Sequence, residues 1–374
     1  MKYIIISSIL LLSLSCTQKG KAVVVNTISI EDTIVSPKKV TLLFAGDLMQ
    51  HITQIKAAFN GKEYDYSECF RYVKDEISNA DIAIGNLEVT IGGKPYSGYP
   101  TFSAPDEFLF SIKDAGFDVL LTANNHCLDK GKKGLERTVM MMDSLNFIYA
   151  GCYINENERS QKYPLFLEKD GIRISLLNYT YGTNGLKQSP PNIVNYIDKE
   201  VMSKDIQAAK SQQPDVIIAC MHWGDEYKLL PNKEQKDLTE WLFEQGVTHI
   251  IGGHPHVVQP MELRTDSLTE KQNIILYSLG NFISNMSAVN TDGGIMFKME
   301  LTKDSTSTYV SDCGYSSVWT AKKGPKRKNH TLIPANFPVD SLSTEEQGKM
   351  KVFLNNARNL FSKHNRNINE YTFY

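Results

Sequence analysis

Two histidines that stand one residue apart, His254 and His256, have the type and spacing to bind a ligand together. They follow the apolar run 250–251 and two glycines, Gly252 and Gly253. An uninterrupted apolar run that ends in glycine predicts a buried strand, and glycine lets the backbone turn sharply close to a ligand. Two imidazoles at a strand end can bind an ion such as zinc or iron. Taken alone, the pair is equally compatible with structural histidines or with a surface pair.

Polar side chains of metal-ligand or catalytic type also follow four other predicted strands. Open α/β sheets bind ligands at the carboxyl ends of their strands, so we expect these groups to converge. A single Gly-Asp or Asn-His pair carries little information, whereas recurrence at five strand ends is hard to obtain by chance. The residues are Asp47, Asn86 with Glu88, Asn125 with His126, and His222.

Strands and helices alternate in the first half of the chain, which favours a parallel sheet with helices outside it. A hairpin over 164–177 is then predicted to turn at Asp170-Gly171, and the later consecutive strands favour a second or mixed sheet packed on the first. The predicted strands are 40–47, 81–88, 118–123, 147–152, 215–221, 249–251, 274–279 and 295–301, and the predicted helices are 67–80, 106–115, 134–145, 199–211, 233–245 and 344–362.

Six motifs taken together resemble the CapA family, which is associated with poly-γ-glutamate capsule biosynthesis. The likeness extends over about residues 40–297. The family is grouped with calcineurin-like metallophosphoesterases, so the resemblance implies an α/β fold built as a four-layer α/β/β/α sandwich of two mixed sheets. The motifs are Leu43-Phe44-Ala45-Gly46-Asp47-Leu48-Met49, Gly85-Asn86-Leu87-Glu88, Ala123-Asn124-Asn125-His126-x-x-Asp129-x-Gly131, His222-Trp223-Gly224-x-Glu226-Tyr227, Gly253-His254-Pro255-His256 and Tyr277-Ser278-Leu279-Gly280-Asn281-Phe282.

The resemblance also implies a role for each matching residue. Asp129 could orient His126, or it could be a turn or cap residue. Asn281 could approach a substrate, or it could be a turn amide. The implied metal ligands are Asp47, Glu88, Asn125, His222, His254 and His256; the implied catalytic residues are His126 and Asp129; and we place Asn86, Glu226 and Asn281 at the substrate.

Two positions depart from the phosphoesterase pattern. Met49 stands where the first motif usually has a histidine, and Asn86 stands where the second motif usually has a bridging aspartate. Glu88 could take over the bridging role, or one metal ion could bind more tightly than the other. We therefore expect one or two divalent metal ions, and the ligand types suit Mn, Fe or Zn without selecting one.

Such a site predicts a metal-dependent hydrolase of capsule or cell-envelope polymer metabolism. A two-metal centre can promote hydrolysis of a phosphoester, and the same ligands can polarise the carbonyl of an amide such as a γ-glutamyl bond. The expected partner is an anionic polymer or a small phosphoester or peptide substrate. The alternative is a non-catalytic factor that binds polymer during capsule assembly or export, to which the basic loop 322–328 could contribute.

The N-terminus predicts export and anchoring. Lys2, an apolar run and Ser15-Cys16 resemble a bacterial lipoprotein signal, and the alternative is simple secretion. We therefore expect a signal peptide at 1–15, lipidation at Cys16, a tether at 16–39, a CapA-like domain at 40–312, and a C-terminal basic loop and helix at 313–374. The protein would then be lipid-anchored to a membrane in the bacterial cell envelope, outside the cytoplasm.

Composition and cysteine usage bear on two further questions, nucleic-acid binding and disulfide bonds. The formal net charge of −2 gives no general case for nucleic-acid binding, because nucleic-acid-binding proteins usually carry a basic surplus. The five cysteines after Cys16 are scattered and form no Cys-x-x-Cys pair, so no disulfide framework is expected.

Overall fold

A computed structural model describes residues 36–325 and 327–373. The expected signal peptide, Cys16 and the tether up to residue 35 lie outside the described residues. None of the described helices is long and apolar enough to cross a membrane. Residues from Ser36 onward form one compact unit.

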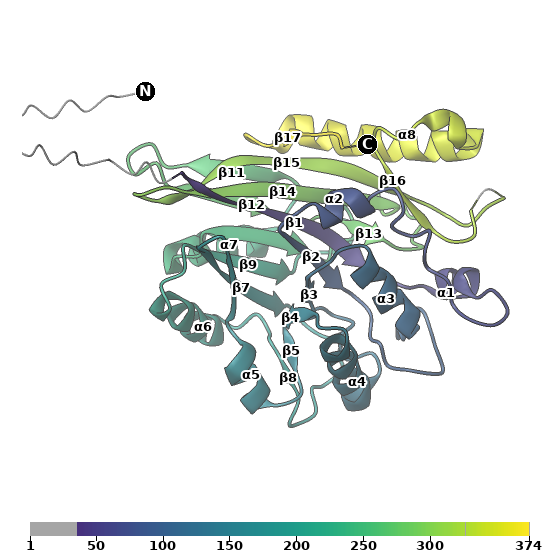
Figure 1. Ribbon diagram of the computed structural model, residues 1–374, viewed down its shortest axis with the longest axis horizontal. Helices are drawn as coiled ribbons and strands as arrows, with labels where there is room; N and C mark the ends of the chain where they lie inside the picture. Colours follow the sequence, from purple (N-terminus) through teal and green to yellow (C-terminus); the bar gives the residue numbers. More distant parts are fainter. Residues whose placement is uncertain (1–35, 326, 374) are drawn as a thin grey trace, which may run out of the picture. The chain divides into compact units, whose positions relative to one another are not determined.

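Two large mixed sheets form the centre of this unit (Figure 1). In the first, β1, β2, β3 and β4 are parallel neighbours, and β14 to β16 continue from β1 on its other side as antiparallel strands. The bounds are β1 (Lys38–Leu48), β2 (Ile82–Leu87), β3 (Val119–Leu121), β4 (Ile148–Ala150), β14 (Gly293–Lys303), β15 (Thr308–Ala321) and β16 (Thr331–Pro334), with β13 (Asn281–Ile283) on β1 and β17 (Asn369–Glu370) on β15.

The second sheet has parallel strands in its middle and an antiparallel strand at each edge. Its order is β11-β12-β10-β9-β7-β6. The turn between β6 and β7 is the expected two-residue turn, with left-handed backbone at both Asp170 and Gly171. The bounds are β6 (Leu165–Lys169), β7 (Ile172–Thr180), β9 (Val216–His222), β10 (His249–Gly253), β11 (Met261–Thr265) and β12 (Gln272–Leu276), and β5 (Cys152–Tyr153) pairs separately with β8 (Ile193–Val194).

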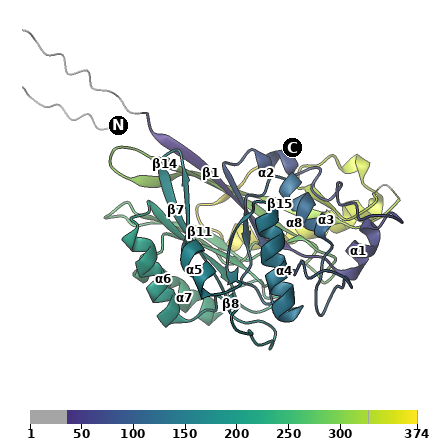
Figure 2. The ribbon, with the colours of Figure 1, turned by 60° about the horizontal axis from the view of Figure 1, so that its bottom comes forward.

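Helices cover the outer faces of both sheets. α8 runs along the first sheet over β15, whereas α6 and α7 lie beside the second sheet (Figures 1 and 2). The expected four-layer α/β/β/α sandwich of two mixed sheets is therefore confirmed. The helices are α1 (Ile52–Ala58), α2 (Lys74–Ser78), α3 (Asp106–Asp114), α4 (Gly131–Ser144), α5 (Glu156–Lys162), α6 (Lys199–Ser211), α7 (Lys233–Gln245), the 3-10 helix η1 (Val339–Ser341) and α8 (Thr344–His364).

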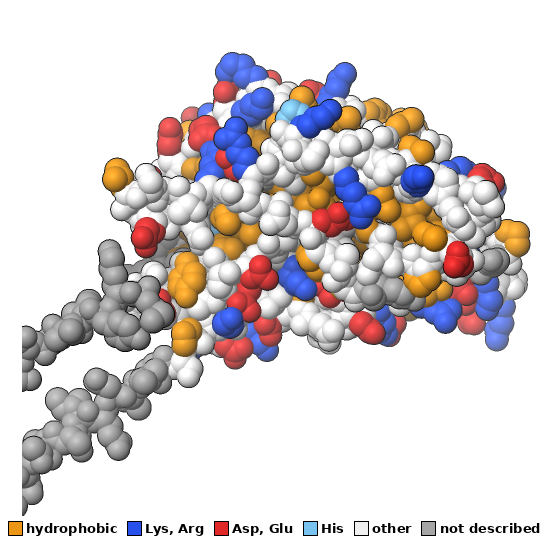
Figure 3. All heavy atoms as spheres, turned by 90° about the horizontal axis from the view of Figure 1, so that it is seen from above, with side chains coloured by type: hydrophobic (Ala, Val, Ile, Leu, Met, Phe, Trp, Pro, Cys, Tyr) orange, Lys and Arg blue, Asp and Glu red, His pale blue; other side chains and the backbone are white. Residues whose placement is uncertain are grey.

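One apolar core extends through the two sheets, and a second, smaller one lies under α8. The second half of β1 is buried without alternation, as expected for a strand covered on both faces. Trp319 and Ile333 meet Met350 and Phe353 of α8 in the smaller core. On the face that carries α8, basic and acidic side chains are interspersed (Figure 3).

Two sequence-based expectations differ from the structure. The helix expected over 67–80 is helical only in α2, because the amide of Leu332 bonds the carbonyl oxygen of Cys69 (2.9 Å), which a continuous helix would use itself. Phe70, Val73 and Ile77 are nevertheless buried as their spacing predicted. In addition, β15 continues without a break past residue 312, where we expected the CapA-like domain to end.

Gly46 lets the end of β1 approach the chain that leads into β13. A β-carbon at Gly46 would lie 2.0 Å from the carbonyl oxygen of Gly280. That same carbonyl accepts a hydrogen bond from the amide of Asp47 (3.0 Å). The glycine of the Gly-Asp motif is therefore required by close backbone packing next to the site.

We expect Gly46→Ala to lower the free energy of unfolding by about 3 kcal/mol, because the new methyl group overlaps backbone atoms that cannot move aside. Urea denaturation followed by circular dichroism measures this change. Gly348→Ala in α8 is the matched control, since no atom lies within 4 Å of its added β-carbon. Equal stability of the two variants would contradict the packing argument.

Acid should destabilise this fold through buried neutral histidines. Burial lowers the pKa of His249 and of His330 to about 3 each, with Lys271 adding to the effect on His249 and Lys322 to that on His330. Between the ordinary pKa of about 6.5 and these values, the unfolded chain binds more protons than the folded one. Stability is therefore fully present above about pH 6.5 and is lost as the pH falls towards 3. Urea midpoints between pH 7 and pH 4 measure the loss, and it should be smaller in His249→Gln.

Candidate metal centre

The two sheets bring the polar ends of five strands to one place. Asp47 is the penultimate residue of β1, Glu88 directly follows β2, His222 ends β9, and His254 and His256 follow β10. Asn125 joins them from the loop after β3. All six of these expected ligands are buried. The convergence expected from the strand-end pattern is therefore present, with contributions from both sheets.

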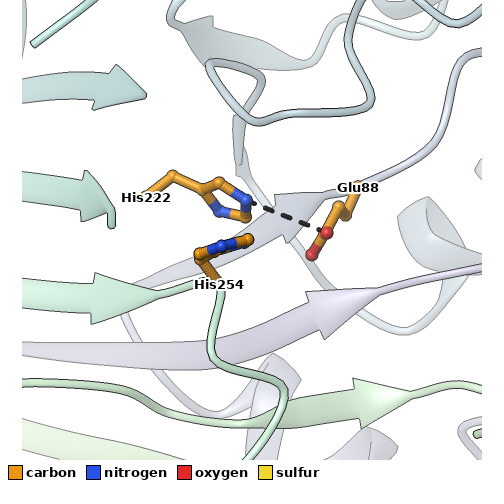
Figure 4. A group of neighbouring side chains, drawn as sticks. All are labelled: Glu88, His222 and His254. Carbon is orange, nitrogen blue, oxygen red and sulfur yellow. Dashed lines mark ion pairs between the residues drawn. The ribbon is translucent and has the colours of Figure 1, made fainter. Parts of the chain in front are cut away.

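Glu88, His222 and His254 form the first of three overlapping groups of potential ligands. Their potential ligand atoms all lie within 4.8 Å of one another. Figure 4 shows the two imidazoles and the carboxylate turned towards one another, with His222 Nε2 3.8 Å from Glu88 Oε1. Asn125 Oδ1 lies 2.7 Å from the same His222 Nε2, so an amide oxygen borders this group.

Asp47, Glu88 and His256 form the second group. His256 Nδ1 lies 3.4 Å from Asp47 Oδ2, and His256 Nε2 lies 3.8 Å from Glu88 Oε1. Glu88 is thus common to both groups, which is the arrangement that a bridging carboxylate requires. Met49 is buried, and His51, the next histidine along the chain, belongs to none of the potential ligand groups among the described residues.

Three buried atoms of the cluster have no hydrogen-bond partner within the described chain: Asp47 Oδ2, Glu88 Oε1 and His254 Nδ1. Unpaired buried polar atoms are costly, so such a set indicates a ligand that pairs with all of them. Burial, with the nearby Asp47, raises the pKa of Glu88 well above its usual value. Burial, with the neighbouring histidine His256, lowers the pKa of His254 to about 3. Carboxylates and neutral imidazoles gathered in this way fit a divalent metal ion.

The backbone after β10 adopts left-handed conformations at both of its histidines. His254 has φ 101° and His256 has φ 58°, both in the left-handed region that residues with a β-carbon rarely adopt. Such conformations cost of order 1–3 kcal/mol each and persist where the surrounding structure holds them. A β-carbon at Gly253 would lie 3.2 Å from Asp47 Oδ1, so this glycine also leaves room for the carboxylate.

His126 and Asp129 form a buried pair beside the cluster. His126 Nδ1 lies 2.8 Å from Asp129 Oδ2, and the same carboxylate oxygen accepts the amide hydrogen of Phe102 (2.6 Å). The phenyl ring of Phe102 meets the imidazole edge to face, with the ring centres 4.6 Å apart. α4 begins only at Gly131, so the contacts of Asp129 are those of a residue that orients His126 rather than of a helix cap.

The three residues expected at the substrate occupy different environments. Asn86 donates to Asp47 Oδ1 (2.7 Å), and Asn281 Oδ1 lies 3.0 Å from His256 Nδ1, so both buried amides hold ligand side chains. Glu226 is exposed and forms a third potential ligand group with His254 and His256. Of the three, Glu226 alone is exposed.

Sequence reasoning missed several residues around the cluster. Asn124 donates to Asn86 Oδ1 (3.2 Å) and to the carbonyl oxygen of Leu87 (2.8 Å), which ties the second and third motifs together. The half-exposed ring of Tyr181 packs on His254, with the ring centres 4.5 Å apart. A hollow of about 610 Å³ borders Tyr181 and is also lined by Trp223 and Lys199. Nothing in the spacing of Tyr181 marks it, because it simply follows the end of β7.

These features define a mixed α/β protein with a candidate divalent-metal centre at the carboxyl ends of strands from two sheets. The family model described as bacterial capsule synthesis protein PGA_cap matches residues 41–286, and the chain belongs to this family. The resemblance found in the sequence motifs is thereby confirmed.

Two relatives show how far the likeness extends. The capsule biosynthesis protein CapA of Bacillus anthracis is 29% identical over 284 residues, which cover 72% of this chain and 66% of that protein. The PGA biosynthesis protein CapA of Bacillus subtilis (strain 168) is 25% identical over 321 residues, which cover 82% of this chain and 78% of that protein.

Solved structures that align with this chain include phosphoesterases. The calcineurin-like phosphoesterase YfkN from Bacillus subtilis is 12% identical, with a TM-score of 0.44, and the alignment covers 85% of this chain and 99% of that one. The 5'-nucleotidase from Candida albicans is 13% identical, with a TM-score of 0.41, and the alignment covers 86% of this chain and 58% of that one.

Proposed function

We propose that this protein is a metal-dependent hydrolase that cleaves a phosphoester or γ-glutamyl amide bond in capsule or cell-envelope polymer metabolism. The observation that carries the proposal is the position of Glu88 between two groups of potential metal ligands, with unpaired buried atoms in both. Ions held there would act as Lewis acids on a phosphoryl or carbonyl oxygen of the substrate. The family relationship supports the setting of capsule synthesis.

The protein's own residues provide proton transfer. His126 Nδ1–H donates to the Asp129 carboxylate, which leaves Nε2 as the atom that can exchange a proton with a substrate. A positioned imidazole of this kind can protonate the leaving group, which is the alcohol oxygen of a phosphoester or the nitrogen of an amide. Phe102 shields the pair, because its ring lies against His126 and its amide holds Asp129.

Metal analysis and substrate profiling test the proposal. Purified protein would be loaded separately with Mn²⁺, Fe²⁺ and Zn²⁺, and bound metal would be counted by elemental analysis. Each loaded form would then be offered a phosphomonoester, a phosphodiester and a γ-glutamyl peptide. We expect one or two bound ions and turnover of one bond class. Protein that binds no metal would refute the proposal, and polymer binding without turnover would favour the non-catalytic assembly factor.

We also propose that the chain is anchored in the cell envelope through a lipid on Cys16, outside the cytoplasm. The support is the apolar run followed by Ser15-Cys16 in the sequence. The expected result is that the expressed full-length protein partitions with membranes and that Cys16→Ser moves it to the soluble fraction. Mass spectrometry of the mature N-terminus checks the lipid, and an unmodified N-terminus at another position would contradict the proposal.

A further inference from the structure

His51 lies beside the candidate metal centre without belonging to it. It directly precedes α1, on the short loop that follows β1. Its ring meets the ring of Phe102 edge to face, with centres 5.2 Å apart, and Phe102 also meets His126 and Tyr99 edge to face. His51 and His126 thus contact the same phenyl ring, and His51 is close enough to His126, His256 and Lys322 for positive charge on them to lower its pKa.

The hydrogen bonds of His51 select one tautomer. The amide of Asn285 donates to Nδ1 (3.3 Å), and Gln54 Oε1 lies equally far from the same nitrogen. Gln54 Oε1 already accepts the amide hydrogen of His51 (2.8 Å), whereas the Asn285 amide has no other acceptor among the described residues. All groups are paired only if Nδ1 carries a lone pair, so the proton of the neutral ring is on Nε2.

Buried groups hold Asn285 in place for this contact. His330 Nε2 lies 2.8 Å from Asn285 Oδ1, and Lys322 Nζ donates to the carbonyl oxygen of Asn285 (3.2 Å). His330 is fully buried. These contacts join Lys322, at the start of the basic loop, to Asn285. The residue that donates a hydrogen bond to His51 is therefore itself held in place.

His51 Nε2 is free to bind a ligand. It has no hydrogen-bond partner within the described chain, and it is not among the buried atoms left unpaired, so it is open to solvent. Burial of the rest of the ring lowers the pKa of His51 to about 4, which keeps the imidazole neutral near pH 7. A neutral N–H next to a cluster of metal ligands suits an oxygen atom that carries negative charge.

We infer that His51 is a substrate-binding residue whose Nε2–H donates a hydrogen bond to an oxyanion of the substrate at the metal centre. The inference rests on the proposed function in taking this cluster as the substrate site. His51 and His126, which both contact Phe102, would then have different roles. His126 exchanges a proton with the substrate, whereas His51 binds a substrate oxygen and exchanges no proton.

Titration with inorganic phosphate tests this inference on the intact protein. Calorimetry would give the phosphate affinity of metal-loaded and metal-free wild type and of the variant His51→Phe, which keeps a ring beside Phe102 but has no donor. We expect the variant to bind phosphate about 10-fold or more weakly, the cost of one hydrogen bond to a charged group. Its metal affinity should stay within twofold of the wild-type value, because His51 is not a ligand.

Two further variants separate binding from folding. His249→Phe is the matched control: His249 Nδ1 also accepts a backbone amide, that of Ile274 (3.2 Å), but His249 lies at the start of β10, at the opposite end of this strand from the ligands. It should leave phosphate affinity unchanged. His51→Gln restores an N–H donor and should recover part of the affinity.

The outcomes divide clearly. The inference would be overturned if the phosphate affinity of His51→Phe were within twofold of the wild-type value in both metal states. It would also be overturned if the wild type bound no phosphate. Loss of metal affinity together with phosphate affinity would also overturn it, because His51 would then act on the ligands. If phosphate binding depends on His51 while no bond is hydrolysed by the wild type, the hydrolase proposal fails and the binding role of His51 stands.

Discussion

A Glu88→Gln variant is expected to lose bound metal and nearly all hydrolytic activity. Glu88 is the one carboxylate common to the two ligand groups, and a neutral amide is a much weaker ligand than a carboxylate. Turnover should fall on the order of 10²–10³-fold or more, the scale of losing a group that stabilises charge in the transition state. Elemental analysis should show that the metal content of the variant is reduced.

The stability of the same variant should change in opposite directions with and without metal. Burial and the nearby Asp47 raise the pKa of Glu88, so the stability that its protonated form provides is present below about pH 4.5 and is lost as the pH rises. At pH 7.5, metal-free Glu88→Gln should therefore unfold at a higher urea concentration than metal-free wild type. With metal present, the order should reverse, because only the wild type gains binding energy.

Glu226→Gln is the matched control for Glu88→Gln. Glu226 also lies near His254 and His256, but it is exposed and does not connect the two inner groups. We expect wild-type metal content and a change in turnover of less than about tenfold. If Glu226→Gln lost metal and Glu88→Gln kept it, the centre would be built on the outer group and our assignment of the ligands would be wrong.

A His126→Ala variant is expected to keep its metal and lose turnover by about 10²–10⁴-fold, the usual contribution of a general acid. The reason is geometric: His126 is held by Asp129 at 2.8 Å and lies outside the ligand groups. The loss should be greatest for substrates with a poor leaving group, because these need protonation most. Initial rates with a series of phenyl phosphates of graded leaving-group pKa measure this dependence.

Asp129→Asn separates orientation from proton transfer. The amide can still contact both His126 and the Phe102 amide, but it cannot accept the His126 proton as strongly as a carboxylate does. We expect a smaller fall in turnover than in His126→Ala, together with a shift in the alkaline limb of the pH–rate profile, because a general acid acts only while it is protonated. A His126→Ala variant with wild-type turnover on every substrate would remove the pair from the mechanism.

The sequence by itself determined the positions of the main strands and the set of polar residues that follow them. Unbroken apolar runs that end at Asp47, Asn86 and His222 lie on strands as expected, because burial on both faces of a strand leaves a clear local signature. Helices α6 and α7 begin and end at the expected residues, and Asp198 and Asn232 cap their N-termini. Apolar runs and helix caps of this kind depend only on residues that are close together along the chain.

Only the tertiary structure shows which groups each of these polar side chains contacts. Asn86 and Asn281 were expected at the substrate, and the fold brings their amides into contact with Asp47 and His256, which the sequence does not predict. His51 had no marked spacing, and its tautomer depends on Asn285, which is 234 residues away. These roles follow from the register and packing of strands that are distant in sequence, and local apolar periodicity does not encode that information.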